Sequence, residues 1–143
     1  MRYTTLLIGF GIALFSFVKP ANAQVKEVQL TVGDSLTLGP CTGENFEYAH
    51  VDILIKTRFP DSTATYNKET GEGFYKWYFT GDIDSRRLPC SFQRMKFRIA
   101  AIHNYPQPDG TTRTVVFGQF IDDATVLWIE INEAVKSGEV TAG

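Results

Sequence analysis

Two histidines, 16 carboxylates and two cysteines are the side chains from which a catalytic or metal site would be built. His50 and Asp52 share one face of a predicted strand and offer two metal ligands, but the spacing defines no third ligand. His103 is predicted on the inward face of a hairpin, where a half-buried histidine bonded to the backbone is the simpler interpretation. Asp122-Asp123 resembles a turn and does not match a calcium-binding EF-hand loop.

Motifs for nucleophilic catalysis, zinc hydrolysis or nucleotide binding are absent from the chain: it has no GxSxG, HExxH, P-loop or glycine-rich dinucleotide sequence. Ser91 has no assignable base, and the spacing of the acids selects no pair for glycoside hydrolysis. The aromatic residues Tyr75, Trp77 and Tyr78 could stack on sugar rings, although such a run more often belongs to a core. The sequence therefore indicates no catalytic residue and no cofactor.

Residues 1–23 have the organisation of a signal peptide. Arg2 supplies a positive start, LLIGFGIALFSFV an apolar stretch, and Ala21-Asn22-Ala23 a small-residue cleavage site. The apolar stretch is shorter than the roughly 20 residues that a membrane-spanning helix needs, so we expect no membrane insertion. The mature chain, residues 24–143, is then expected to be one exported domain, periplasmic or secreted.

The charge of the mature part argues against some partners. Removing Arg2 and Lys19 with the signal peptide leaves 12 basic and 16 acidic residues, a net charge of −4. A negative domain is poorly suited to nucleic acid or to an anionic membrane surface. We therefore expect the partner to be another protein or a second copy of this chain.

Cys41 and Cys90 are the only cysteines, and both follow the signal peptide. An even pair in an oxidising compartment predicts one disulfide. Closing a loop of about 50 residues would stabilise the fold by roughly 3–4 kcal/mol. The alternative, a redox or metal pair, lacks both a CxxC spacing and a histidine beside either cysteine.

The segment 94–131 predicts three consecutive antiparallel strands. A two-residue turn at Asp109-Gly110 would place Ile99 opposite Phe120, and a second turn at Asp122-Asp123 would set the next register. The two registers agree, because they gather one apolar set on the inward face. That set comprises Phe97, Ile99, Val116, Phe120, Leu127, Ile129 and Ile131.

The remaining segments predict further strands. A first hairpin is expected over 25–38 around Gly33-Asp34, a long strand over 46–59, and an aromatic strand over 73–80. After Ile131 a short helix is expected, with Asn132 as N-cap, Gly138 as its stop and a frayed end beyond. The fold class is therefore all-β, an antiparallel β-sandwich or partly closed barrel of about seven strands with a short C-terminal helix.

The outer face of the predicted meander is the candidate binding surface. By the same registers it gathers Ile102, Phe117 and Trp128, with Lys96 and Arg98 beside them. A solvated sheet face should be mostly polar, so something is expected to cover this one. The cover could be the first hairpin or the C-terminal helix, a second copy, or a partner.

These observations favour a small exported, non-catalytic binding or interaction protein of the inhibitor, immunity or envelope-accessory type. Two alternatives stay open. One is a small secreted hydrolase with its site in the 60–73 loop region. The other is a carbohydrate-binding module that uses Trp77 or Trp128.

Overall fold

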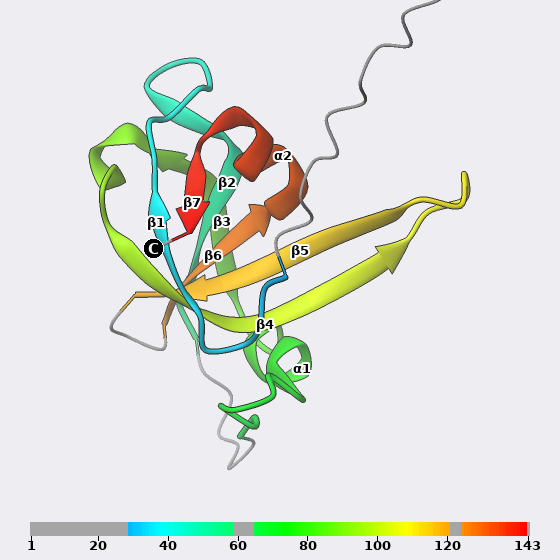
Figure 1. Ribbon diagram of the computed structural model, residues 1–143. Helices are drawn as coiled ribbons and strands as arrows, with labels where there is room; N and C mark the ends of the chain where they lie inside the picture. The colour runs from blue at the N-terminus through cyan, green and yellow to red at the C-terminus, as the bar shows by residue number, and fades with distance from the viewer. Residues whose placement is uncertain (1–28, 59–64, 121–123, 143) are drawn as a thin grey trace, which may run out of the picture.

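The computed structural model describes residues 29–58, 65–120 and 124–142. They form one antiparallel sheet of seven strands in the order β3-β2-β6-β5-β4-β1-β7 (Figure 1). The elements are β1 (Ser35–Leu38), β2 (Glu47–Lys56), α1 (Phe74–Tyr78), β3 (Ile83–Pro89), a 3₁₀ turn η1 (Cys90–Phe92), β4 (Lys96–Pro106), β5 (Thr112–Gln119), β6 (Thr125–Glu130), α2 (Ile131–Ser137) and β7 (Val140–Ala142). The all-β antiparallel class, the strand number and the helix near the C-terminus are thus confirmed, although the sheet does not close into a barrel.

The inner face of the sheet carries the larger core, and the sheet bends around it. Leu88 from edge strand β3 and Val140 from edge strand β7 belong to the same apolar cluster, with Ala134 of α2. All seven residues predicted to face inward lie in this cluster or pack against it. The apolar pattern of 94–131 therefore identified the inner face correctly.

The outer face is covered by the chain itself, through helix α1. Phe74 and Tyr78 are fully buried, and the Phe74 ring lies 5.3 Å from the ring of Phe117 on β5. The predicted strand over 73–80 is therefore wrong. Residues four apart in a helix share one face, and here Phe74 and Tyr78 are the pair that is buried, whereas Tyr75 remains 44% exposed.

Polar contacts fix α1 on the sheet. The Tyr78 hydroxyl donates to the carbonyl oxygens of Leu54 at 3.0 Å and Ala124 at 2.8 Å. Lys56 on β2 is buried, and its ammonium donates to the carbonyl oxygens of Trp77 at 2.9 Å and Tyr78 at 2.7 Å. These are carbonyls of the last helical turn, which a cation stabilises. Burial lowers the pKa of Lys56.

The β4–β5 hairpin turns differently from the prediction. Gly110 has the expected positive φ of 84°, but Asp109 does not share it. The Gly110 N–H donates to the Gln107 carbonyl at 3.1 Å, and the Gln107 N–H donates to the Thr111 carbonyl at 2.8 Å. Pro108 presets the φ of a type I turn, and Gly110 then supplies the left-handed residue of a three-residue loop. The predicted two-residue turn at Asp109-Gly110 is therefore wrong, because the loop also includes Pro108.

A β-bulge at Ala100 then changes which side chains share a face. Ile99 lies in the inner core as predicted, but opposite Gly118 rather than Phe120. Beyond the bulge, Ile102 packs against the inner core and His103 lies on the outer face beside Tyr75. The sequence predicted the opposite faces for these two residues. The extra residue at the bulge reverses the alternation, and no sequence pattern marks it.

The β5–β6 register agrees with the prediction, since Val116 pairs with Ile129. The Asp122-Asp123 turn itself lies outside the described residues. The predicted strand before Gly33 does not form over residues 29–32, and β1 pairs with β4 and β7 instead. Residues 25–28 and the expected signal peptide also lie outside the described part of the chain.

The end of the chain is more ordered than the sequence indicated. Helix α2 begins at Ile131 with Glu130, not Asn132, in the N-cap position, and it ends at Gly138 with a φ of 82° as predicted. The expected frayed end is wrong, because residues 140–142 form strand β7 against β1.

The two sides of the bent sheet are joined along one line of contacts. We call this line the seam, and it comprises Cys41, Cys90, Glu139 and Tyr48. The predicted disulfide between Cys41, after β1, and Cys90, after β3, is present with a Cα–Cα distance of 5.5 Å. Beside it lies the fully buried carboxylate of Glu139, which precedes β7. Tyr48 at the start of β2 donates its hydroxyl to the Gly39 carbonyl at 2.6 Å, and burial together with the Glu139 charge raises the pKa of Tyr48 to about 12.

Glu139 is held by four hydrogen-bond donors. Its Oε1 accepts from the Thr42 N–H at 2.8 Å, the Thr42 hydroxyl at 2.8 Å and the Ala49 N–H at 2.7 Å, and its Oε2 accepts from the His50 N–H at 2.9 Å. Burial raises the pKa of this carboxyl, but the four hydrogen bonds outweigh burial and lower it below its ordinary value of 4.5. The ionised form is therefore the one that the fold stabilises.

We expect Glu139→Gln to lower the free energy of unfolding at pH 7 by about 3 kcal/mol, because the amide turns one acceptor into a donor that faces a backbone N–H. Urea denaturation measures the change. Since the folded pKa lies below the unfolded value, the stabilisation is complete above about pH 4.5 and is lost as the pH falls through the folded pKa. The difference between wild type and variant should shrink in that acidic range.

The matched control is Glu133→Gln on the exposed side of α2. This change should leave the free energy of unfolding nearly unchanged, both at pH 7 and in the acidic range. A stability of Glu139→Gln equal to that of the control would contradict the role assigned to the buried carboxylate.

Candidate functional site

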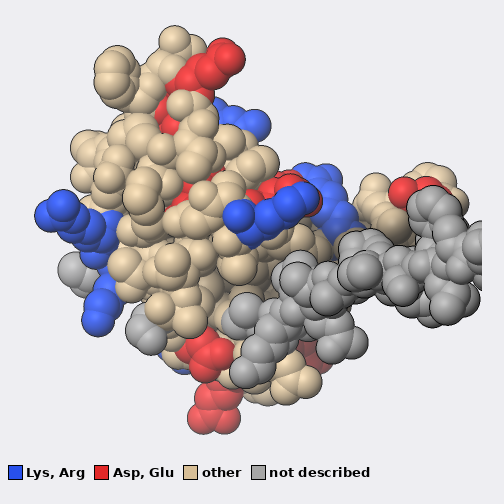
Figure 2. Space-filling view, turned by 45° about the horizontal axis from the view of Figure 1, so that its top comes forward, with Lys and Arg blue, Asp and Glu red and all other residues tan. Residues whose placement is uncertain are grey.

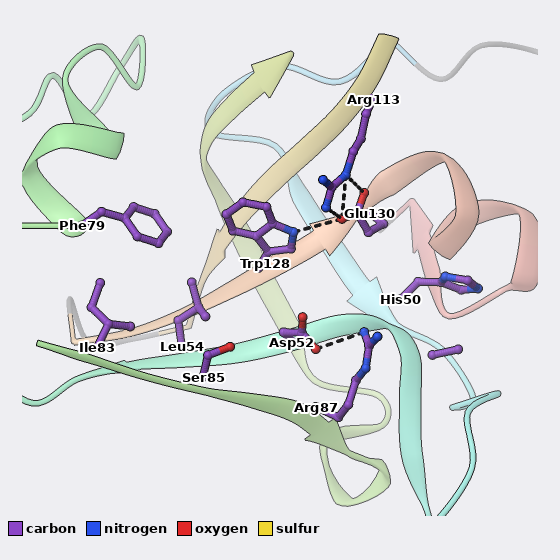
Figure 3. A pocket seen from close by; sticks show the side chains of 11 residues that line it. His50, Asp52, Leu54, Phe79, Ile83, Ser85, Arg87, Arg113, Trp128 and Glu130 are labelled. Atoms are coloured by element: carbon purple, nitrogen blue, oxygen red, sulfur yellow. Dashed lines mark hydrogen bonds and ion pairs between the residues drawn. The ribbon is translucent and has the colours of Figure 1, made fainter. Parts of the chain in front are cut away.

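A pocket of about 590 Å³ opens on the outer face beyond the end of α1 (Figure 3). We call it the Trp128 pocket. Its walls come from β2, β3, β5, β6 and the residue after α1, and they consist of Ala49, His50, Asp52, Leu54, Phe79, Ile83, Ser85, Arg87, Arg113, Trp128 and Glu130. Pockets of roughly 300–1,000 Å³ are typical of small-molecule sites.

Trp128 is the largest side chain of the pocket and is half-buried. Its ring meets Phe117 edge-on at 5.3 Å and Phe79 edge-on at 6.1 Å, so the aromatic layer under α1 continues into the pocket wall. The Arg113 guanidinium lies over the indole, 5.8 Å from its centroid. These contacts fix the orientation of the indole before any ligand arrives.

Glu130 links the polar side of the pocket to Trp128. Arg113 Nε donates to both Glu130 oxygens, at 3.0 and 2.8 Å, and Arg113 Nη2 also bonds Oε1. The Trp128 indole N–H donates to the same Oε1 at 3.1 Å. The Arg113 hydrogen bonds lower the pKa of Glu130 more than burial raises it, so this carboxylate stays ionised.

Asp52 is the second carboxylate of the pocket, and its environment raises its pKa, the opposite of the effect on Glu130. It forms an ion pair with Arg87 at 3.0 Å, and its side chain is 30% exposed. Partial burial raises the pKa of Asp52, and the nearby Arg87 charge only partly offsets that effect. The pocket thus holds two carboxylates whose pKa values are shifted in opposite directions from their ordinary values.

His50 lies at the far end of the pocket, away from Phe79 (Figure 3). It and Asp52 share the pocket wall, as the sequence suggested, but the described residues contain no group of three or more His, Cys, Asp or Glu placed to hold a metal ion. In the same part of the chain, every helix is too short or too polar to cross a membrane.

The five residues predicted as a binding surface are separated by the fold. Phe117 is fully buried under α1, so it cannot itself contact a partner, and Ile102 is on the inner face. Lys96 and Arg98 are exposed on β4, where Arg98 Nη2 donates to the Lys68 carbonyl at 3.2 Å. Trp128 alone of the five lines the pocket. The predicted contact between Phe117 and Trp128 is confirmed, and the contact of both with Ile102 is wrong.

The sequence did not point to Arg87, Arg113 or Ser85 as site residues. Ser85 and Arg87 lie on strand β3, which the sequence did not predict. Two signals in the sequence could have indicated the site. Asp52 and Leu54 are two residues apart on one strand, and so are Trp128 and Glu130, so each pair lies on one strand face.

Charge is mixed over the surface as well as in the pocket. On the face shown in Figure 2, basic and acidic side chains of the described residues are interspersed. Comparison of the chain with protein families, with curated proteins and with solved structures finds no significant match.

We expect carboxyl NMR titration to place the pKa of Asp52 above its ordinary 3.8 and that of Glu130 below its ordinary 4.5. Arg113→Gln should raise the pKa of Glu130 because it removes the hydrogen bonds that favour the ionised form. Arg87→Gln, the matched change at the other pair, should raise the pKa of Asp52 instead. A Glu130 pKa that is unaffected by Arg113→Gln would contradict this assignment.

Proposed function

We propose that this chain is a small exported, non-catalytic binding protein and that the Trp128 pocket is its ligand site. The observation that carries the proposal is a partly exposed tryptophan, Trp128, held rigidly in a pocket whose two arginines are each paired with a carboxylate. Rigid aromatic anchors with oriented polar neighbours bind ligands at low entropic cost. The Cys41–Cys90 disulfide fits an oxidising, exported location, and within it we propose the periplasm or the extracellular medium.

The pocket chemistry favours a neutral sugar as ligand. Arg87 and Arg113 are balanced by Asp52 and Glu130, so no net charge is offered to an ionic ligand. The C–H face of a pyranose can pack on the indole while its hydroxyls bond the edges of the two ion pairs. This is the carbohydrate-binding alternative, with Trp128 rather than Trp77 as the platform. Trp77 instead lies against Lys56, whose ammonium is 5.4 Å from the Trp77 ring centroid.

A second candidate, a small hydrolase, is favoured by the two carboxylates with opposed pKa shifts. Two neighbouring carboxyls whose environments act on their pKa values in opposite directions are a feature of many acid–base pairs. The pair lies in the Trp128 pocket and not in the 60–73 loop region, of which residues 65–73 are described. Binding is the better supported function, because each carboxylate is engaged by its own arginine and is not left open toward a substrate.

The binding proposal is tested by NMR titration of the protein with neutral hexose and N-acetylhexosamine oligomers. Shift changes should centre on Trp128 and its neighbours, and Trp128→Ala should weaken binding at least about tenfold. Met95→Ala, which alters another exposed apolar side chain outside the pocket, should leave binding unchanged. Shift changes confined to another surface, or none, would contradict the proposal.

The same sugars distinguish the two candidates when product release is followed. The intact oligomers should persist with the wild-type protein. Release of shorter sugars that is lost in Asp52→Asn would replace the binding proposal by the hydrolase.

A further inference from the structure

The Trp128 pocket changes from apolar to polar along its length, and two neighbouring strands show the same order. Alternate residues of a strand share one face. The residues that line the pocket in this order are Leu54, Asp52 and His50 on β2, and Ile83, Ser85 and Arg87 on β3. Leu54 pairs with Ser85 across the two strands. Asp52 pairs with Arg87, so both series run from apolar to polar in the same direction.

Strand β6 repeats this order on the other side of β2. Val126 is fully buried in the cluster that contains Phe74 of α1. Trp128 follows it on the same face and is half-buried, and Glu130 is the charged residue beyond. The indole therefore lies between an apolar end and a polar end of the pocket (Figure 3).

The apolar end is formed by Leu54, Phe79 and Ile83, three hydrocarbon side chains that lie together on one side of Trp128 (Figure 3). Leu54 is only 4% exposed, whereas Phe79 and Ile83 are half-buried and can be covered further. A ligand hydroxyl placed against these side chains would lose its hydration without gaining a hydrogen bond from them. A methyl group in the same place would gain from its burial.

The polar end keeps hydrogen-bonding capacity although its charges cancel. Arg113 bonds Glu130 through Nε and Nη2, and Arg87 Nη1 bonds Asp52 Oδ1. A guanidinium has five N–H donors and a carboxylate can accept about four hydrogen bonds, so both ion pairs can also bond ligand hydroxyls. Ser85 lies between the two ends and supplies a hydroxyl that both donates and accepts.

We infer that the ligand of this pocket is an N-acetylhexosamine, bound with its acetyl methyl group at the apolar end. The pyranose ring packs on Trp128, the hydroxyls bond the two ion pairs, and the amide lies beside Ser85. A plain hexose has only a hydroxyl to place where this ligand places its methyl group. The inference rests on the proposed function of the Trp128 pocket and names the ligand class within it.

Calorimetric titration with three β-1,4-linked trimers tests the inference. Their units are N-acetylglucosamine, N-formylglucosamine and glucose, and the N-formyl sugar keeps the amide but lacks the methyl group. The N-acetyl trimer should bind about tenfold more tightly than either of the others. Equal affinities would overturn this inference and leave the proposed function standing, whereas a failure of all three trimers to bind would remove both.

The apolar end is tested by Ile83→Ser, which replaces a hydrocarbon side chain with a hydroxyl. The preference for the N-acetyl over the N-formyl trimer should fall below about threefold, and the affinity for the glucose trimer should stay within about twofold of wild type. Met95→Ser is the matched change at an exposed apolar residue outside the pocket, and it should keep the full preference. A full preference in Ile83→Ser would contradict the assigned position of the methyl group.

Intermolecular NOEs give the orientation of the sugar in the wild-type protein and require no folded variant. The acetyl methyl protons of the N-acetyl trimer should show NOEs to the side chains of Leu54 and Ile83, and none to the ring of His50. NOEs to His50 in place of Leu54 and Ile83 would overturn the inference even if the N-acetyl trimer binds most tightly.

Discussion

The buried carboxylate of Glu139 is the interaction on which the arrangement of this fold depends. The sheet bends so far that both edges contribute to one core, yet among the described residues no strand pairing closes the gap between them. Glu139 precedes edge strand β7 and accepts hydrogen bonds from backbone N–H groups at the other side of the gap, at the start of β2. The Cys41–Cys90 disulfide crosses the same gap with a covalent bond. An apolar side chain in the place of Glu139 would leave several buried donors without acceptors.

The outer face depends on a different device. Helix α1 has only five residues, too few to be stable alone, and it is held by the Tyr78 hydroxyl, the Lys56 ammonium and an aromatic layer on Phe117. Because α1 ends before it reaches Trp128, the covered part of the sheet passes directly into an open pocket. The position at which α1 ends therefore decides which aromatic residue belongs to the core and which can meet a ligand.

The sequence predicted the inner core better than the outer face, for physical reasons. Alternation along β5 and β6 assigned Val116, Leu127 and Ile129 correctly, because one side of those strands must be apolar wherever the ends of the strands lie. The segment 73–80 is aromatic on every side, so neither a period of two nor one of 3.6 stands out, and the helix was missed. The bulge at Ala100 leaves no mark in composition. The arginines of the pocket could not be found before strand β3 was placed beside β2.

The hydrogen bonds of Glu139 have a consequence for the order of folding. They join residues separated by 89 to 97 positions in the chain, among the longest separations in the molecule. A chain that emerges from its N-terminus first therefore makes β1 and β2 long before the acceptor that joins them is available. Until then both sides of the gap expose backbone donors and apolar side chains, which is the condition that chaperones recognise. The seam therefore cannot close before residue 139 has been synthesised, and it cannot be among the first parts of the fold to form on a growing chain.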